Sequence, residues 1–400
     1  MSLKRLSLLA SVSILATILA GCVTAPSQPP VATQAPAPVI APTTQKGETL
    51  RPVNFSALPG WDKDDQRESW PAFLASCEVL IKKADWKEPC SIARDVNATD
   101  LQAVRLFFVS FFVPNQVFNA DGSDTGLVTG YYEPLLRGAR KRGGVYQTPI
   151  YRTPDDMLTI DLASVYPELK GMRLRGRIQG NKVVAYYPRA DLAKAGALSG
   201  KELLWVDDPI EAFFLQVQGS GRVALADGGS VVRLAYADQN GYPYKSIGRY
   251  LVDRGELTLD QASAQGIKAW YAAHPERQQE LLNANPSFVF FKEESISDPR
   301  KGPKGALGVP LTPQRSIAVD TLFIPLGAPV YLSTTQPNNP AVLQRLMMAQ
   351  DTGGAIKNAV RADYFWGFGA EAGEKAGKMK QRGTMWVLLP KLPANTAMVK

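Results

Sequence analysis

Two segments in the first third of the chain carry apolar residues at the three- and four-residue spacing of an amphipathic helix. The first is Ser69–Trp86, with Pro71 in its first turn, where proline is well tolerated. The second is Asp100–Val113, which Thr99 or Asp100 caps and Pro114 ends. The pattern therefore predicts two N-terminal helices.

From Gly126 onward the pattern changes to short runs rich in β-branched and aromatic residues, separated by Gly, Pro and Asp. In chain order these runs are LVTGYYEP, VYQTPIYR, LRGRIQGNKVVAYYP, AFFLQVQGSGRVAL and SVVRLAYA. Short runs of this kind predict a barrel or a compact sheet domain.

Helical spacing returns between Ser246 and Asn283, and four apolar residues there are core candidates: Leu251, Ile267, Trp270 and Leu281. After Pro286 the strand-like runs resume as SFVFFK, APVYLS, LQRLMMAQD and TMWVLLP, with repeated prolines between them. Because proline disfavours long central strands, we expect a small barrel of short strands. A strand-and-helix insert that interrupts a barrel domain is the simplest arrangement that explains this order.

The first residues predict export and lipidation. Two basic residues precede the apolar run Leu6–Ala20, which is shorter than the roughly 20 residues of a membrane-spanning helix. The run leads through Gly21 into Cys22, a pattern typical of lipoprotein signal peptides, although an ordinary secretory signal with a chance cysteine is the alternative. We expect residues 1–21 to be a signal peptide and Cys22 to carry the lipid anchor. Because Val23 is not an acidic retention residue, we expect the periplasmic face of the outer membrane.

Residues 22–47 are dominated by Pro, Ala, Thr and Gln and show no periodicity. Such a segment cannot bury a core and favours extended conformations. We interpret it as a tether that holds the rest of the chain away from the bilayer.

Charge and composition exclude several classes of function. The formal net charge is +8, but basic residues are not interleaved with stacking aromatics, so we expect no nucleic-acid partner. A mildly basic protein suits an acidic polymer such as peptidoglycan, whose stem peptides carry carboxylates.

Histidine and cysteine are scarce. His274 is the single histidine, and Cys77 and Cys90 are the two cysteines besides Cys22. The chain therefore has too few of these residues for a histidine-based mechanism or a catalytic zinc site. In an oxidising compartment Cys77 and Cys90 predict a disulfide.

If the chain breaks a glycosidic bond, a carboxyl group is the expected proton donor, because the single histidine lies in an unpromising position before Pro275. Asp363 precedes three aromatic residues that would raise its pKa by desolvation, although a turn-capping role is the alternative. Asp351, before Thr352 and two glycines, reads as a turn whose backbone bonds lower its pKa, which argues against a donor. Asp320 is a third acid, and Glu133 is a candidate second carboxylate for a hydrolase.

Two further segments suit contacts to sugars. Gln216–Gly221 ends a strand-like run with amides, a hydroxyl and open backbone, although a plain hairpin turn is equally consistent. Gly130–Pro134 combines adjacent tyrosines with a turn. We expect Tyr131, Tyr132, Gln218, Ser220 and Asp351 to contact the substrate.

Several longer motifs resemble one known family. In this order behind the lipidation motif, the chain contains GYYEP, QGSGR, NGYPYKSIGRYL, NPSFVFF, GVPLTPQRSIAVD and QDTGGAIK–RADYFWG. They resemble the membrane-bound lytic murein transglycosylase A family from about Gly130 to Val387. The C-terminal part resembles the family's three-aspartate domain, whose invariant acids fall on Asp320, Asp351 and Asp363.

The resemblance implies a mainly β fold with helices: a double-psi β-barrel domain interrupted by a smaller, mainly β insert, with the substrate groove between them. We expect residues 48–135 and 292–400 to form the barrel domain and residues 136–291 the insert. The third aspartate is the family's catalytic acid, so the resemblance implies that role for Asp363. Glu133 is not required to be acidic in the family and is left as groove lining.

The implied reaction cleaves peptidoglycan without water, requires no cofactor and leaves 1,6-anhydromuramic acid ends. A hydrolase that pairs Asp363 with Asp351 or Glu133, and a non-catalytic wall-binding module similar to expansins, are the alternatives. We expect a monomer that associates with the lipid bilayer, the glycan strand and complexes of cell-wall synthesis or division.

Overall fold

A computed structural model describes residues 49–192 and 194–391, all within one compact unit. The predicted signal peptide, the lipidation site Cys22 and the tether at residues 22–47 lie outside the described residues. Within the described ranges, no helix has the length and apolar content that crossing a membrane requires.

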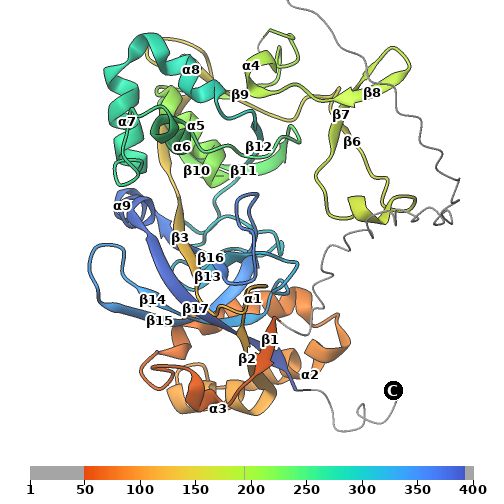
Figure 1. The fold of residues 1–400 in the computed structure, drawn as a ribbon, viewed down its shortest axis with the longest axis vertical. Helices are drawn as coiled ribbons and strands as arrows, with labels where there is room; N and C mark the ends of the chain where they lie inside the picture. Colours follow the sequence, from red (N-terminus) through yellow and green to blue (C-terminus); the bar gives the residue numbers. More distant parts are fainter. Residues whose placement is uncertain (1–48, 193, 392–400) are drawn as a thin grey trace, which may run out of the picture. The chain divides into compact units, whose positions relative to one another are not determined.

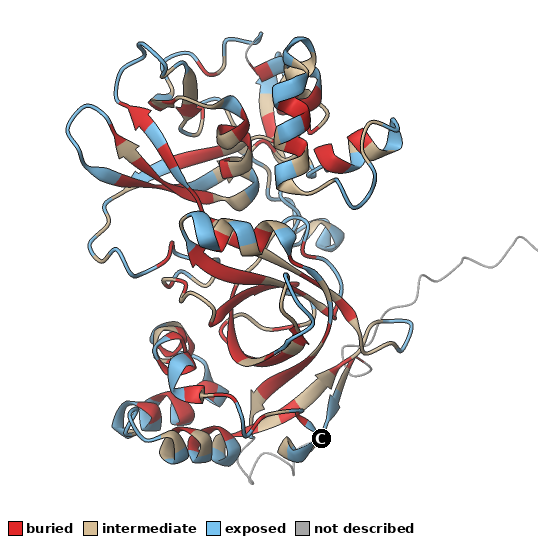
Figure 2. Ribbon diagram, turned by 90° about the vertical axis from the view of Figure 1, so that its left-hand side faces the viewer, coloured by how far each residue is buried: buried red, intermediate tan, exposed pale blue. Residues whose placement is uncertain are grey.

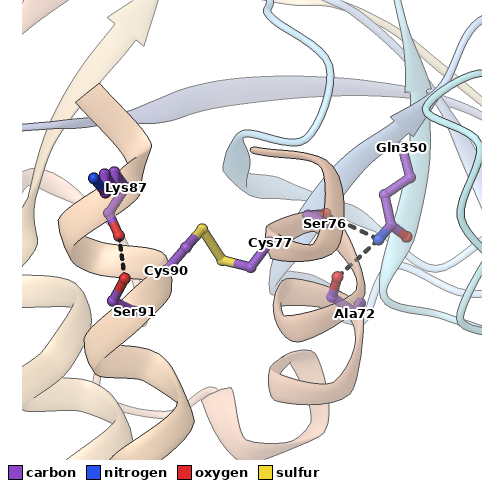
Figure 3. The surroundings of a disulfide bond; sticks show 7 residues. All are labelled: Ala72, Ser76, Cys77, Lys87, Cys90, Ser91 and Gln350. Carbon is purple, nitrogen blue, oxygen red and sulfur yellow. Dashed lines mark hydrogen bonds between the residues drawn. A yellow bond between two sulfur atoms is a disulfide. The ribbon is translucent and has the colours of Figure 1, made fainter. Parts of the chain in front are cut away.

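The N-terminal helical segment is broken where the sequence predicts one continuous helix. The prediction of a single helix over Ser69–Trp86 is wrong, because α1 (Trp70–Leu80) ends before three turn residues and α2 (Ala84–Ile92) begins after them. The break lets the chain double back, so that Cys77 of α1 and Cys90 of α2 form a disulfide with Cα atoms 5.2 Å apart (Figure 3).

The second predicted helix is confirmed as α3 (Leu101–Phe111). Asp100 caps it by accepting hydrogen bonds from the backbone amides of Gln102 and Ala103. The chain then continues directly into β2 (Phe112–Val117), which contains Pro114. The helices of this part pack through edge-to-face aromatic contacts, for example between Trp70 and Phe107 at 4.9 Å.

The larger sheet contains a closed barrel. Six strands form a ring in the order β17–β14–β15–β13–β16–β3, and the pairing of β17 with β3 closes it. Strand β2 pairs with the C-terminal part of β17, and the short β1 (Leu50–Pro52) pairs with β2, so these two strands extend the sheet beyond the ring. The bounds of the ring strands are β3 Gly126–Glu133, β13 Ser316–Val319, β14 Pro329–Thr335, β15 Val342–Asp351, β16 Arg361–Phe368 and β17 Lys380–Pro390. Figure 2 shows these strands curving around a buried interior.

The barrel is therefore assembled from one early strand and five late ones, as a barrel interrupted by an insert requires. Helix α9 (Ala370–Lys378) follows β16 and lies against β3 and β16. The mainly β character with added helices is confirmed, whereas the double-psi connectivity and the domain boundaries stay predictions.

A second sheet of six strands is built from the intervening residues in the order β12–β11–β10–β4–β9–β5 (Figure 1). Its strands are β4 Leu135–Ala139, β5 Thr148–Tyr151, β9 Glu202–Val206, β10 Ser220–Leu225, β11 Val231–Gln239 and β12 Val289–Glu294. The helices of this part are α4 Arg189–Leu192, α5 Pro209–Gln218, α6 Ile247–Asp253, α7 Ala264–Ala273 and α8 Gln278–Asn283. All four core candidates, Leu251, Ile267, Trp270 and Leu281, are buried together among α5–α8, which confirms them.

One strand prediction in this region is wrong. The run AFFLQVQ was expected to be extended, but it belongs to α5. Asp208 caps the helix by accepting from the amide of Ile210, Pro209 opens its first turn, and Gly219 ends it with a left-handed φ of 81°. These end signals override the strand-like composition of the run.

Three short strands form a separate sheet beside the six-stranded one: β6 (Leu158–Thr159), β7 (Arg175–Gln179) and β8 (Lys182–Ala185) (Figure 1). The chain passes between the barrel and the six-stranded sheet twice, at Glu133–Leu135 and after Glu294.

Candidate active site

The alternation of side chains along two paired barrel strands brings the candidate acid together with its neighbours. Strand β16 runs parallel to β3, with Asp363 opposite Thr129 and Phe365 opposite Tyr131. Residues two apart share a face of a strand, so these four side chains lie on one face. Ala362 and Tyr364, which flank Asp363 in β16, belong to the barrel core on the other face.

Asp363 is half-buried, and its two carboxylate oxygens differ in their surroundings. Oδ1 accepts a hydrogen bond of 2.5 Å from the hydroxyl of Thr129. For Oδ2, no hydrogen-bond donor is found among the described residues. One oxygen is thus held in place, while the other is available to a bound molecule.

Thr129 is itself oriented by Arg361, which lies two residues before Asp363 on the same face of β16. A guanidinium nitrogen of Arg361 donates a 2.8 Å hydrogen bond to the Thr129 hydroxyl oxygen. Because this oxygen accepts from Arg361, its own proton is directed to Asp363. The sequence analysis missed Thr129 and Arg361, although their two-residue spacing from Tyr131 and Asp363 in strand-like runs was an available signal.

The electrostatics of Asp363 balance two opposing effects. Burial, the larger effect, raises the pKa of the carboxyl above its usual value, while the Thr129 hydrogen bond and the Arg361 charge lower it. Of the three aromatics that follow Asp363 in sequence, only Phe365 shares its face, where it packs on Tyr131 at 5.1 Å between ring centroids. Burial thus favours the protonated form more than in a free aspartate, and donors are in place for the ionised form.

Asp351, at the end of β15, joins the same cluster through Tyr131. The Tyr131 hydroxyl donates a 3.1 Å hydrogen bond to Oδ2 of Asp351, and Oδ1 accepts from the backbone amides of Ala306 and Thr352. The prediction that backbone bonds leave this carboxyl with a lowered pKa is wrong. Burial outweighs those bonds and raises the pKa of Asp351 to about 6.

The three aspartates have different surroundings. Asp320 is buried and accepts hydrogen bonds from the amides of Leu322 and Asn358, so it holds the loop between β15 and β16. Both oxygens of Asp351 have protein donors. Asp363 alone among the three combines partial burial with an oxygen that no described donor engages.

Glu133 does not line an open surface, contrary to the expectation from the sequence. It is completely buried and forms ion pairs with Arg222 at 2.8 Å and Arg233 at 2.5 Å. Both arginines also donate to the carbonyl oxygen of Lys301, which lies on the second connection between the two large sheets. Glu133 therefore joins the two connections and is held as a paired carboxylate, unsuited to act as a base on substrate.

The remaining predicted contacts lie apart from Asp363. Tyr132 and Gln218 line a cavity of about 600 Å³ beside α5, α7 and α9, and the Tyr132 amide donates to the Gln218 side chain. Because Tyr132 alternates with Tyr131 on β3, this cavity lies on the opposite face of the strand from Asp363. Ser220 is buried at the start of β10, so the structure does not support it as an open contact.

The described residues contain no group of three His, Cys, Asp or Glu side chains that could hold a metal ion. His274 stacks on Trp270 at 4.2 Å between ring centroids, and its Nδ1 lies 2.8 Å from the Trp270 carbonyl oxygen. Its environment is that of a structural residue.

Comparison with known proteins agrees with this arrangement. Residues 127–292 match the MltA specific insert domain, and residues 315–389 match the 3D domain. The membrane-bound lytic murein transglycosylase A of Escherichia coli (strain K12) is 36% identical over 280 residues, which cover 68% of each chain. The chain belongs to the membrane-bound lytic murein transglycosylase A family.

Solved structures of the family share the fold. MltA from Neisseria gonorrhoeae is 40% identical, with a TM-score of 0.74 over 85% of this chain and 92% of that one. The membrane-bound lytic murein transglycosylase from Agrobacterium tumefaciens is 32% identical, with a TM-score of 0.75 over 86% and 98%. E. coli MltA with bound chitohexaose is 30% identical, with a TM-score of 0.62 over 81% and 90%. The family inferred from the motifs is confirmed.

Proposed function

We propose that the protein is a lytic transglycosylase of peptidoglycan. It cleaves the β-1,4 bond between N-acetylmuramic acid and N-acetylglucosamine without water and leaves 1,6-anhydromuramic acid ends. Membership of the family supports cleavage of this polymer, since the relatives are named lytic murein transglycosylases. The chitohexaose bound to E. coli MltA supports a saccharide as the ligand.

The proposed chemistry uses one carboxyl group twice. Protonated Asp363 first donates its proton to the glycosidic oxygen as the bond from that oxygen to C1 breaks. The resulting carboxylate then accepts the proton of the muramyl C6 hydroxyl as that oxygen attacks C1. Asp363 loses one proton in the first step and regains one in the second, so it is ready for the next turnover. No cofactor takes part.

The two inequivalent oxygens of Asp363 carry the proposal. Oδ1 is held by Thr129, while Oδ2 has no donor among the described residues and is the oxygen that would exchange the proton. Burial favours the acid form needed for the first step, and Thr129 and Arg361 stabilise the anion formed by it. These are the properties that a group acting first as acid and then as base requires.

We place the glycan strand along the face that carries Asp363, between the barrel and the insert. Tyr131 and Asp351 belong to this face, where their hydrogen bond fixes the boundary of the site. We also propose that the lipid on Cys22 anchors the protein to the periplasmic face of the outer membrane.

Product analysis tests the proposal. Purified sacculi are digested with wild type and Asp363→Asn, and the soluble products are identified by mass spectrometry. We expect anhydromuropeptides from wild type and a loss of at least about 100-fold in rate for the variant, because removal of a general acid typically costs this much. Lytic activity that survives in Asp363→Asn would reject Asp363 as the acid. Binding to sacculi without release of soluble products by either protein would favour a non-catalytic wall-binding module.

A hydrolase remains the second candidate because Asp351 lies in the same cluster, close enough for the Asp363 charge to help raise its pKa. Such an enzyme would use Asp351 to activate water and would leave reducing ends. Digestion products with reducing muramic acid ends, in place of anhydro ends, would show that the protein is a hydrolase. Glu133 is excluded as its base by burial and by two arginine partners.

A further inference from the structure

Arg189, at the start of α4, is held by two segments that lie far from it in the chain. Its Nε donates a 3.0 Å hydrogen bond to the carbonyl oxygen of Asn285. One terminal nitrogen, Nη2, donates to the carbonyl oxygen of Ser287 at 2.6 Å and to the side-chain oxygen of Gln216 in α5 at 2.7 Å. Asn285 and Ser287 belong to the motif NPSFVFF, which the chemistry proposed for the active site does not use.

The charge of Arg189 is not compensated by a carboxylate. All three acceptors are neutral, and no salt bridge to Arg189 is found in residues 49–192 and 194–391. Asp191, two residues further on, is paired with Lys194 at 3.7 Å. Burial lowers the pKa of Arg189 to about 9, so the guanidinium is still charged at neutral pH. A buried charge without a partner costs free energy, and a bound anion would offset that cost.

One nitrogen of Arg189 is left for such an anion. For Nη1, no acceptor is found among the described residues, whereas Nε and Nη2 are engaged. The guanidinium carbon lies 4.8 Å from the ring centroid of Phe213 and 4.9 Å from that of Phe288. The rings and the carbonyl oxygens fix the orientation of the group, and the side chain is partly exposed. Nη1 is therefore a pre-positioned donor, and little conformational entropy is lost when an anion binds there.

The loop before α6 places two more polar residues next to Arg189. The backbone amide of Lys245 donates a 3.0 Å hydrogen bond to the side chain of Asn285, whose carbonyl oxygen accepts from Arg189. Tyr244 has 38% of its surface exposed, but burial around its hydroxyl raises its pKa, while the charge of Arg189 lowers it. The two groups are thus close enough to interact. Lys245 is exposed, and no salt bridge to it is found in the described part of the chain. The loop adds a hydroxyl donor and a second cation.

Helix α5 separates Arg189 from the candidate active site. Gln216 and Gln218 point to different sides of α5, because two residues turn an α-helix by about 200°. Gln216 accepts from Arg189 on one side, and Gln218 accepts from the backbone amide of Tyr132 in β3 on the other. The width of a helix, about 10–12 Å, therefore lies between Arg189 and the strand that carries the site. At this distance Arg189 does not contact the bond that Asp363 would break.

We propose that Arg189, Tyr244 and Lys245 bind a carboxylate of the peptide that substitutes the glycan strand. Such a site rests on the proposed function, since its ligand is part of peptidoglycan. An extended peptide of about five residues reaches roughly 17 Å, enough to span α5 from a sugar at the active site. The carboxylate accepts from Nη1 of Arg189 and from the Tyr244 hydroxyl, and Lys245 adds a second positive charge. A neutral sugar would leave the charge of Arg189 uncompensated, which disfavours it as the occupant.

Cleavage kinetics with two soluble substrates test the proposal: glycan strands that retain their peptides, and strands from which an amidase has removed them. Contacts remote from the cleaved bond stabilise substrate and transition state equally, so their loss raises KM and leaves kcat unchanged. With peptide-bearing strands we expect KM to rise about 3- to 10-fold in Tyr244→Phe and about two- to fivefold in Lys245→Gln. With peptide-free strands both variants should keep the wild-type KM.

The matched control is Arg249→Gln. It removes a cation of the neighbouring α6 that is already paired with Asp253 at 2.7 Å, and it should equal wild type on both substrates. Arg189 also joins two segments of the fold, so the exposed Tyr244 and Lys245 carry the test. An unchanged KM for peptide-bearing strands in both variants would overturn the proposal. An equal rise with peptide-free strands would overturn it too, and would identify the lactyl carboxylate of muramic acid as the ligand.

Binding of a soluble muropeptide to Asp363→Asn, measured by calorimetry, separates this site from the proposed reaction. Lys245→Gln in that background should weaken the binding about two- to fivefold. If wild type yields no anhydro products but this difference in binding persists, the proposed function alone fails. If wild type yields anhydro products and the difference in binding is absent, the carboxylate site alone fails.

Discussion

Thr129 and Asp363 lie directly opposite each other on parallel strands, and the hydroxyl of Thr129 donates a 2.5 Å hydrogen bond to the carboxylate across 234 positions of sequence. This bond lowers the pKa of Asp363 against the raising effect of burial. The pair therefore sets both the position of the carboxyl and its balance between acid and base.

Thr129→Val removes this bond while preserving the shape of the side chain. The pKa of Asp363 should rise further, because its ionised form loses a donor, so the alkaline limb of the pH–activity profile should move to higher pH. We expect kcat to fall about 10- to 100-fold, the range for loss of one hydrogen bond to a charged group. Sacculus cleavage measured across pH checks both effects. Thr129→Ser keeps the hydroxyl and should resemble wild type, and a Thr129→Val profile superimposable on wild type would contradict this role.

Asp351→Asn should stabilise the protein at neutral pH. The folded-state pKa of about 6 lies above the ordinary value of 3.8, so the folded state binds the proton more tightly than the unfolded state does. Stability is therefore lost as pH rises from about 4 to 6, and the variant should regain about 1–3 kcal/mol above pH 6 but little at pH 4. Denaturant unfolding at both values tests this, with Asp260→Asn at an exposed position as the control. An equal gain at pH 4 would mean that the charge of Asp351 is not its cause.

Glu133→Gln should destabilise the protein strongly. The substitution leaves Arg222 and Arg233 buried without their carboxylate, and breaking such a buried pair costs about 3–5 kcal/mol. Glu293→Gln, which removes the surface partner of Arg140, should cost no more than about 1 kcal/mol. Chemical denaturation of the two variants distinguishes these outcomes. Similar losses for both would show that burial of Glu133 adds nothing.

Replacing Cys77 and Cys90 together by serine should lower the free energy of unfolding by about 3 kcal/mol, since the disulfide closes a short loop with a sequence separation of 13. The nearby Gln350 side chain also ties α1 to β15 by donating to Ala72 and Ser76 (Figure 3). We therefore expect the double variant to fold at low temperature, with thermal unfolding under oxidising and reducing conditions as the measurement. Reduction should move wild type to the Tm of the variant.

The spacing of apolar residues along the chain predicted those helices whose ends are marked by capping residues. Asp100 marks the start of α3, and the apolar spacing after Ser246 identified buried residues such as Leu251 and Trp270. The run before Gly219 was assigned as a strand from its composition, because a short apolar run is ambiguous between strand and helix. Its capping residues, Asp208 and Gly219, were present in the sequence and carried the correct signal.

The site was harder to predict because its properties arise from distant residues. The high pKa of Asp351 results from burial in a cluster that includes Tyr131, which is 220 positions away. The burial of Glu133 depends on arginines 89 and 100 positions away. Contacts between residues so far apart in the sequence cannot be inferred from the residues that neighbour Asp351 or Glu133. Asp363 was singled out as the candidate acid by its place among three aspartates, and the structure adds that one of its oxygens is hydrogen-bonded while the other has no described donor.

The closure of the barrel also fixes when Thr129 and Asp363 can come together. Strand β3 pairs with β16 and β17, which are made more than 220 residues later, so Asp363 has no Thr129 beside it until nearly the whole chain is available. Pairings of such long range form late in folding. Under the proposed mechanism, a nascent or C-terminally clipped chain lacks the Thr129–Asp363 pair and would have no lytic activity until β16 and β17 are in place.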